Sequence, residues 1–291
     1  MTALKRVLVT GASGNVGSAT VTALRAVGIP VRAADRDGQQ IANRFPTTEF
    51  AHFDFLDPST FDAAVDGCDA IFLLRPPPIS RMKHTLNQLI DVAARRGIKH
   101  VIFSSVAGAN TNRVVPHHRV ETHLASSGLA FTILRPGFFA QNLGDAYRDD
   151  IFKDHRLFVP AGNGRVAFVD VRDVGEIAAN IFLAPQLHIG KGYELSGPRA
   201  LTFQEVANTL TAELGRPIRY EAASVHQYVH HLWKRNMPLI QIMVQTILHV
   251  RLRKGDTEHV GETTARLLGH PPRSMETYVH DHLHLWQVSS A

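Results

Sequence analysis

The feature that most constrains the fold of this chain is a glycine-rich segment close to its start. Three apolar residues at positions 7–9 are followed by Thr10 and then by Gly11, Gly14 and Gly17, in the spacing G-x-x-G-x-x-G. From about Asn15, apolar and small residues recur at intervals of three and four, which is typical of a helix. This order predicts a buried parallel strand that turns sharply into a helix. Glycine suits the turn because a side chain there would block close approach to the backbone.

Such a turn is suited to binding a diphosphate. The first N–H groups of the helix and the positive end of its dipole point at the turn, so an anion is stabilised there. The segment therefore predicts a dinucleotide-binding turn, with a glycine-rich turn of some other α/β fold as the alternative. We expect contacts to the cofactor from Gly11, Ser13, Gly14, Asn15, Val16 and Gly17.

The first half of the chain alternates short apolar segments with helical patterns. We expect further strands at residues 31–35, 49–54, 70–74, 101–104 and 131–135, and helices at 58–65, 80–96 and 115–127. Strands that alternate with helices imply right-handed crossovers and a parallel sheet covered on both faces. The pattern therefore predicts the α/β class, with a doubly wound Rossmann sheet.

The pattern loosens after Gly137. We expect a strand at residues 166–170 and a helix at 173–183 that return to the main sheet. Capping-box signatures at residues 202–205 and 224–227 mark helix starts in the tail. We predict a Rossmann domain of residues 1–145, with 166–185 returning to it, and a smaller C-terminal α/β lobe of residues 146–165 and 186–291 that binds substrate.

Composition narrows the classes of partner and compartment. The chain has 291 residues, 44% of them hydrophobic and 20% charged, and a net charge of +5 that does not demand nucleic acid. A single cysteine, Cys68, excludes an intrachain disulfide and fits the cytoplasm, and the start of the chain has no signal-peptide pattern. We expect a small-molecule substrate, no nucleic acid, no membrane, and a possible homodimer or regulatory protein partner.

Two further features of the tail have more than one interpretation. The apolar stretch of residues 238–250 is too short to span a bilayer and is more often core than interface, with a lid or a dimer contact as alternatives. His226 and His230, and His280 and His284, have the i, i+4 spacing of metal ligands. No third ligand accompanies either pair in the sequence, so we expect no metal site.

Several segments of the chain resemble the NmrA-like group of NAD(P)-binding proteins, which are atypical short-chain dehydrogenases/reductases. They are the glycine turn, D-F-L-D at 54–57, F-L-L-R-P-P at 72–77, F-S-S-V at 103–106, L-R-P-G-F-F-A-Q-N at 134–142, F-V-D-V-R-D-V at 168–174 and L-L-G-H-P-P near the end. The resemblance implies a Rossmann domain and a small C-terminal lobe with the ligand cleft between them. It also implies contacts to adenine from Asp54 and Phe55.

The end of the second expected strand bears on the form of the cofactor. Asp35 lies eighteen residues after Gly17, where a carboxylate accepts hydrogen bonds from the ribose hydroxyls of NAD and repels a 2′-phosphate. The neighbouring Arg36 instead favours NADP(H), because its guanidinium can pair with the 2′-phosphate. We expect NAD(P)(H), with a lean to NAD(H).

Residues that follow the other strands complete the predicted site. Ligands of open α/β sheets bind at the carboxyl ends of the strands. We therefore expect further cofactor contacts from Leu74, Arg75, Ser104, Pro136, Gly137 and Phe138, and substrate contacts from Phe139 and Asn142.

The catalytic part of the pattern is incomplete. Short-chain reductases place a serine after the fifth strand, then a tyrosine and, four residues later, a lysine, but residues 114–123 contain neither tyrosine nor lysine. Ser105 is the candidate serine, and His117 could replace the tyrosine as acid with Glu121 orienting it. The alternative is that His117 and Glu121 lie on an exposed helix surface without a catalytic role.

Together these features predict an NAD(P)H-dependent oxidoreductase. It would transfer hydride to a small apolar carbonyl, enone, imine or quinone. The alternative is a non-catalytic NAD(P)-binding redox sensor of the NmrA type, which the missing tyrosine and lysine keep open. An isomerase with a fixed nucleotide is a third, less favoured interpretation.

Overall fold

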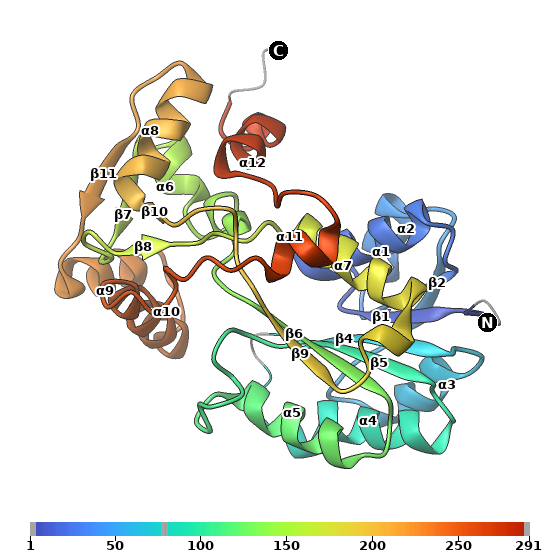
Figure 1. Cartoon of the computed structure of the whole chain (residues 1–291). Coiled ribbons are helices and arrows are strands. Elements are labelled where there is room, and N and C mark those ends of the chain that lie inside the picture. The colour runs from blue at the N-terminus through green and yellow to red at the C-terminus, as the bar shows by residue number, and fades with distance from the viewer. Residues whose placement is uncertain (1–3, 77–78, 80, 288–291) are drawn as a thin grey trace. The chain divides into compact units, whose positions relative to one another are not determined.

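The computed structural model describes residues 4–76, 79 and 81–287, and the chain divides into two compact units (Figure 1). Unit 1 comprises Met1–Pro136, Val171–Leu195 and Thr263–His270, and unit 2 comprises Gly137–Asp170, Ser196–Glu262 and Pro271–Ala291. The first boundary falls between Pro136 and Gly137, nine residues before the predicted end of the Rossmann domain at residue 145.

Unit 1 is built on a seven-stranded sheet in the order β3-β2-β1-β4-β5-β6-β9. Every neighbouring pair is parallel, so the predicted doubly wound α/β sheet is confirmed. The order reverses direction between β1 and β4, which is where open α/β sheets bind ligands at the carboxyl ends of their strands. The strands are β1 (Val7–Thr10), β2 (Val31–Asp35), β3 (Glu49–His52), β4 (Ala70–Leu74), β5 (His100–Ser104), β6 (Phe131–Pro136) and β9 (Lys191–Leu195).

Helices cover both faces of this sheet, as continuous apolar strands require. Figure 1 shows α1 (Asn15–Ala26) and α7 (Val171–Leu183) on one face, and α4 (Leu86–Arg95) and α5 (Pro116–Ser126) on the other. α1 and α7 lie so close that a Cβ on Gly175 would come within 2.7 Å of the carbonyl oxygen of Ala19. The remaining helical segments of unit 1 are η1 (Pro58–Thr60), α2 (Gly38–Arg44), α3 (Phe61–Val65), η2 (Met82–His84), η4 (Pro185–Leu187) and α11 (Thr263–Leu268).

Two expectations for unit 1 were wrong. The helix predicted for residues 80–96 is broken at Thr85 (φ −132°, ψ −100°) into η2 and α4, and Ser80 itself lies outside the described residues. The second concerns β9, which extends the main sheet beside β6, although the sequence placed these residues in the small lobe. β9 is an edge strand, four of its five residues are at least partly exposed, and it therefore lacks the apolar run that identifies a central strand.

Unit 2 has its own core and two small sheets. β7 (Arg156–Val159) pairs in parallel with β11 (Arg219–Ala222), and β8 (Arg165–Val166) pairs antiparallel with β10 (Leu201–Thr202). Its helices are η3 (Ala140–Leu143), α6 (Arg148–Phe152), α8 (Phe203–Leu214), α9 (Val225–Lys234), α10 (Leu239–Leu252), α12 (Met275–Asp281) and η5 (Leu283–Leu285). Both predicted capping boxes are confirmed: Thr202 and Glu205 open α8, and Ser224 and Gln227 open α9.

Two other expectations for unit 2 need correction. The strand predicted at residues 166–170 does not return to the main sheet, because these residues belong to unit 2 and only Val166 lies in a strand, β8. The backbone of Ala167 pairs instead with the carbonyl of Thr257, and Val169 bridges to Phe139. The apolar stretch of residues 238–250 forms α10 but is not core throughout. Only one face of α10 is buried, including Ile242, and the opposite face is exposed. No helix among the described residues is long and apolar enough to cross a membrane.

Candidate functional site

The glycine turn of unit 1 has the predicted local structure. β1 is completely buried and passes into Gly11, whose φ of +58° lies in the left-handed region that glycine adopts without strain. The N–H of Gly14 donates to the carbonyl of Gly11 at 3.1 Å, which closes the turn, and α1 begins at Asn15. The side chain of Leu74, at the end of β4, lies over this turn, 2.9 Å from where a Cβ on Gly11 would be.

The turn accepts a diphosphate for two structural reasons. A Cβ on Gly17 would lie only 2.1 Å from the carbonyl oxygen of Gly11, so this position tolerates no side chain while the turn keeps its shape. The N-cap of α1 is Gly14, which offers no side chain to cap the helix. No side chain therefore caps the start of this twelve-residue helix, and a helix start of this kind is suited to an anion. The residues present thus fit a dinucleotide diphosphate.

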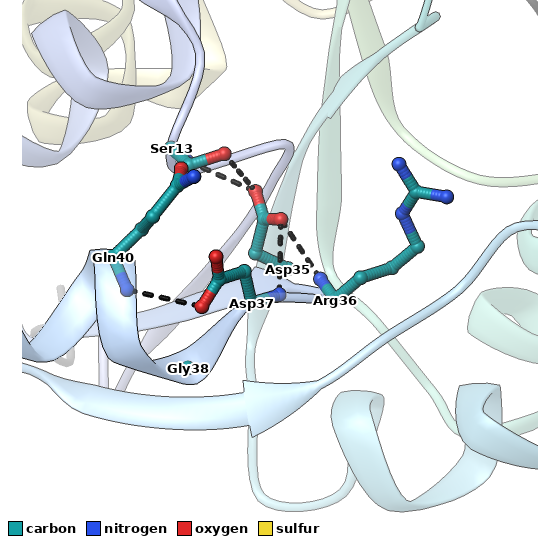
Figure 2. A pocket seen from close by; sticks show the side chains of 6 residues that line it. All are labelled: Ser13, Asp35, Arg36, Asp37, Gly38 and Gln40. Carbon is teal, nitrogen blue, oxygen red and sulfur yellow. Dashed lines mark hydrogen bonds between the residues drawn. The ribbon is translucent and has the colours of Figure 1, made fainter.

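Asp35 is one of the residues that line a polar pocket beside the glycine turn. The pocket has a volume of about 540 Å³ and is lined by Ser13, Asp35, Arg36, Asp37, Gly38 and Gln40. As Figure 2 shows, one carboxylate oxygen of Asp35 accepts from the N–H (3.0 Å) and the hydroxyl (2.7 Å) of Ser13. The other oxygen accepts from the backbone N–H groups of Arg36 (2.8 Å) and Asp37 (3.5 Å).

This arrangement changes what the strand end can recognise. A carboxylate has about four lone-pair sites, and four protein donors already face Asp35, so little acceptor capacity remains for ribose hydroxyls. The exposed side chain of Arg36 extends away from the Asp35 carboxylate in Figure 2. Within the described part of the chain, its guanidinium forms no ion pair, so its charge is available to an incoming anion.

The next two predicted contacts lie after β3. The carboxylate of Asp54 accepts from the N–H of Leu56 at 2.9 Å and so stabilises its own turn. The ring of Phe55 is buried against Phe53 and Phe61, with ring centroids 4.7 and 6.4 Å away. Their contact with adenine stays a prediction.

Arg75 and His117 contact each other although they come from different strand–helix connections. Arg75 follows β4 and His117 lies in the first turn of α5, and the Nε of Arg75 donates to the Nε2 of His117 at 3.2 Å. The same guanidinium donates to the carbonyl of Ile79 at 2.5 Å. Nε2 of His117 is therefore an acceptor, and its buried Nδ1 has no hydrogen-bond partner in the described residues.

This environment makes His117 a neutral imidazole at neutral pH. Its side chain is buried, and burial together with the neighbouring Arg75 cation lowers the pKa of His117 to about 3. The expectation that Glu121 orients His117 is wrong, and so is the alternative of an exposed helix surface, because both residues are buried and neither contacts the other. An imidazole with this pKa is not in its protonated, cationic form at pH 7, so His117 lacks the imidazolium proton that an acid catalyst would donate.

Glu121 instead forms an ion-pair cluster with Ser105 and Arg135. The hydroxyl of Ser105 donates to one oxygen of Glu121 at 2.5 Å, and the guanidinium of Arg135 binds both oxygens, with the shortest distance 2.7 Å. Glu194 of β9 lies 3.8 Å from the same guanidinium. The hydroxyl proton of Ser105 is thus committed to Glu121, so Ser105 faces any further partner as an acceptor.

Sequence reasoning missed Arg135 and Glu194. Arg135 had a visible signal, because it is the one charged residue in an otherwise apolar strand. Space for it comes from Gly192, where a Cβ would lie 2.5 Å from the guanidinium, and that relation cannot be read from the sequence. The other strand-end candidates of unit 1, Ser104 and Pro136, are buried at the ends of β5 and β6.

The remaining predicted contacts belong to unit 2. Gly137 begins it, and the ring of Phe138 packs edge-on against Phe168 and His249, with centroids 5.8 and 5.9 Å away. Phe139 bridges to Val169, and Asn142 lies in η3 with its backbone carbonyl accepting from Tyr147. All four are partly exposed, and their roles stay predictions.

The histidine pairs do not form a metal centre. His280 lies in the last turn of α12 and pairs with Glu213, whereas His284 lies in the separate segment η5, so the two do not share one helix face. The described residues contain no group of three or more histidine, cysteine, aspartate or glutamate side chains placed to hold a metal ion.

The fold and the glycine turn define a Rossmann-type α/β protein with a second, smaller unit. The chain belongs to the NmrA-like family, whose model matches residues 3–279. An NAD(P)H azoreductase from Xenophilus azovorans is 30% identical over 283 residues, covering 95% of this chain and 97% of that protein.

Two solved structures share the fold. An NADPH-dependent quinone oxidoreductase from Escherichia coli is 25% identical with a TM-score of 0.80, and the match covers 96% of this chain and 99% of that one. NmrA, a negative transcriptional regulator in complex with NADP, is 19% identical with a TM-score of 0.79, covering 97% and 96% of the two chains. The proteins to which the chain is similar thus include both reductases and a regulator.

Proposed function

We propose that this protein is an NAD(P)H-dependent reductase of small apolar acceptors. The observation that carries the proposal is the bare glycine turn at the uncapped start of α1, which fits a diphosphate. The similarity to an azoreductase and a quinone oxidoreductase over nearly the whole chain supports the reductase class. When bound, NAD(P)H supplies a hydride, and the protein supplies binding and orientation.

We further propose that unit 1 holds the nucleotide. Gly11, Ser13, Gly14 and the first turn of α1 bind the diphosphate, and Leu74 packs over the turn that they form. Phe138, Phe139 and Asn142, at the start of unit 2, offer an apolar surface and one amide to the acceptor.

For the form of the cofactor we propose NADP(H). The lean to NAD(H) is not supported by the similar structures, of which one is named as NADPH-dependent and another contains NADP. Within this chain, the Asp35 carboxylate is already engaged by four donors, and the exposed Arg36 guanidinium is available to a 2′-phosphate.

The state of His117 and Ser105 favours acceptors that need no acid from the protein. The imidazole of His117 is neutral, and the hydroxyl of Ser105 donates to Glu121. An acceptor whose reduced form takes its proton readily from water, such as a quinone, meets this condition better than a simple ketone, which requires general-acid assistance. Quinones are therefore the first acceptors to test.

Turnover by the purified full chain tests the proposal. NADPH and NADH are each followed at the absorbance band of the reduced nicotinamide against a matched panel of quinones, enones and simple ketones. We expect NADPH oxidation with quinones, weaker oxidation with enones and none with ketones. Turnover of simple ketones at rates equal to those of quinones would contradict the role assigned to His117 and Ser105.

The second candidate function is a nucleotide-binding sensor without turnover. The missing tyrosine and lysine, together with the neutral His117, favour it, and a regulator shares the fold. Saturable binding of NADPH with no oxidation by any acceptor of the panel identifies the sensor. Binding followed by steady oxidation identifies the reductase.

A further inference from the structure

Unit 2 carries an unusually large exposed apolar surface on α9 and α10. Nine of the seventeen large hydrophobic side chains that are exposed in the described residues fall within the 24 positions from 225 to 248. They are 36–76% exposed, whereas the exposed apolar side chains of a typical monomer are mostly scattered singly. The nine are Val225, Val229, Trp233, Leu239, Ile240, Met243, Val244, Ile247 and Leu248.

The exposure of these residues on α10 follows the helical period of the sequence, which separates a buried face from an exposed apolar face. On α10, Ile242, Thr246, His249 and Leu252 are buried, at i, i+4, i+7 and i+10. The exposed residues Ile240, Met243, Val244, Ile247 and Leu248 follow the same helical period on the other face. α10 therefore carries an exposed apolar face in addition to the face that unit 2 covers.

The charges around this surface identify the partner that fits it. Residues 225–254 contain five lysines and arginines and no aspartate or glutamate. Arg235 pairs with Asp150 and Arg251 with Asp256, whereas Lys234, Arg253 and Lys254 are exposed and have no acidic partner within the described ranges. A partner that offers both apolar depth and negative charge satisfies both features.

We propose that α9 and α10 dock on the surface of an anionic lipid bilayer. A helix with an exposed apolar face lies in the interface with that face buried among the acyl chains, and neighbouring lysines and arginines bind the lipid phosphates. Trp233, which is 60% exposed on α9 beside Lys234, is the residue type that favours the interfacial region.

A second copy of the chain is the less favoured occupant. An exposed apolar face of this kind is also typical of a surface that binds another protein. However, a symmetric contact would place the lysines and arginines of one copy beside those of the other, with no acidic residue of α9 or α10 to offset them. The proposal also revises the expectation of no membrane partner. That expectation was drawn because the apolar stretch of residues 238–250 is too short to span a bilayer. A helix that lies flat at the membrane surface does not need that length.

Vesicle binding by the full chain tests the proposal independently of the cofactor. The protein is titrated with vesicles of phosphatidylcholine alone and of phosphatidylcholine mixed with phosphatidylglycerol, at low and high salt. We expect at least 10-fold tighter binding to the anionic vesicles, reduced by salt. We also expect a blue shift of Trp233 fluorescence that is absent in Trp233→Phe, since the other tryptophan, Trp286, is already buried.

Matched variants separate the two features of the surface. The triple variant Ile240→Gln, Met243→Gln, Ile247→Gln, and the triple variant Lys234→Gln, Arg253→Gln, Lys254→Gln, should each weaken binding about 10- to 100-fold. The control replaces three exposed apolar residues of unit 1, Val114, Leu183 and Leu187, by glutamine and should bind normally. All are exposed positions, and thermal melting verifies that the variants fold.

Two results would overturn the proposal. One is an absence of binding to anionic vesicles by the folded wild-type chain. The other is a stable dimer in sedimentation velocity that becomes monomeric in the apolar triple variant, which would assign the surface to a second copy.

Discussion

The glycine turn follows β1 and the segment between Ser104 and Glu121 follows β5, so both begin at the carboxyl edge of the sheet in unit 1. They differ in how much of the pattern of a short-chain reductase they retain. The turn retains every glycine that close approach of a diphosphate requires, and a Cβ at Gly17 is sterically excluded. The second segment retains a serine but contains neither tyrosine nor lysine, and its His117 and Glu121 are each paired with an arginine. The chain therefore retains the turn that suits a nucleotide diphosphate, but it lacks the tyrosine and lysine that usually supply the proton.

The largest expected effect comes from the turn. Gly17→Ala places a methyl group 2.1 Å from the carbonyl oxygen of Gly11, so the turn must open. We expect the affinity for NADPH to fall by at least 100-fold in calorimetry. The control is Gly14→Ala, whose Cβ would meet the same oxygen at 3.4 Å and should cost much less. A folded Gly17→Ala protein with wild-type affinity would show that the turn does not hold the diphosphate.

The second effect concerns the 2′-phosphate. Arg36→Gln removes a cation whose charge-assisted hydrogen bonds contribute ~1.5–3 kcal/mol, so the Kd for NADPH should rise about 10- to 100-fold. The Kd for NADH should change by less than about threefold. Arg44→Gln, at the exposed end of α2, is the control and should alter neither. Equal losses for both nucleotides would refute the role of Arg36.

The third effect is on stability. Glu121→Gln leaves the nearly buried guanidinium of Arg135 without its bidentate partner, and breaking a buried pair costs about 3 kcal/mol. The control Asp62→Asn breaks an exposed pair with Arg96 and should cost less than about 1 kcal/mol. Urea denaturation followed by circular dichroism measures both. If Glu121→Gln lowers the free energy of unfolding no more than Asp62→Asn does, the cluster does not stabilise the packing of β5, α5 and β6.

The fourth effect is a dependence of stability on pH. Burial lowers the pKa of His117 to about 3 and those of His100 and His249 to about 4, from an ordinary value of 6.5. Below pH 6.5 the unfolded chain binds protons that the folded chain does not, so stability is complete above this pH and is lost as pH falls toward 4. Each histidine contributes up to ~1.4 kcal/mol per pH unit.

His117→Phe tests this assignment because it removes one of the three histidines. The slope of the unfolding free energy between pH 6 and 4.5 should decrease by up to ~1.4 kcal/mol per pH unit. Circular dichroism is the appropriate signal, because both tryptophans lie in unit 2. An unchanged slope would mean that the pKa of His117 in the folded protein is close to its ordinary value.

The smallest expected effect is on turnover. Because neither residue supplies a proton at neutral pH, Ser105→Ala and His117→Phe should each change kcat with a quinone by less than about threefold, with an unchanged pH profile. A loss of 100-fold or more in kcat would restore the acid–base role that the sequence suggested.

The sequence predicted the parts of the molecule that depend on local chemistry. The order of strands and helices in the first half, the glycine turn and both capping boxes follow from periodicity, backbone freedom and helix ends. The break at Thr85 has no such local signal. The site was less predictable, because the partners of Asp35 and Glu121 come from other elements and only the fold brings them together.

Two errors have the same physical origin. The expectation for His117 assumed a partner four residues away on the helix, whereas its partner Arg75 lies 42 residues earlier in the chain. β9 was misplaced because an exposed edge strand such as K-G-Y-E-L lacks the apolar run of a central strand. In both cases tertiary contacts determined the outcome.

The most direct test of the central claim is a calorimetric titration of the folded wild-type chain with NADPH. We expect saturable binding of one NADPH per chain with a Kd below about 1 mM, in the range of ordinary reductase substrates, and loss of that binding in Gly17→Ala. An absence of binding of both NADPH and NADH, in a protein whose circular dichroism and melting show an intact fold, would contradict the account.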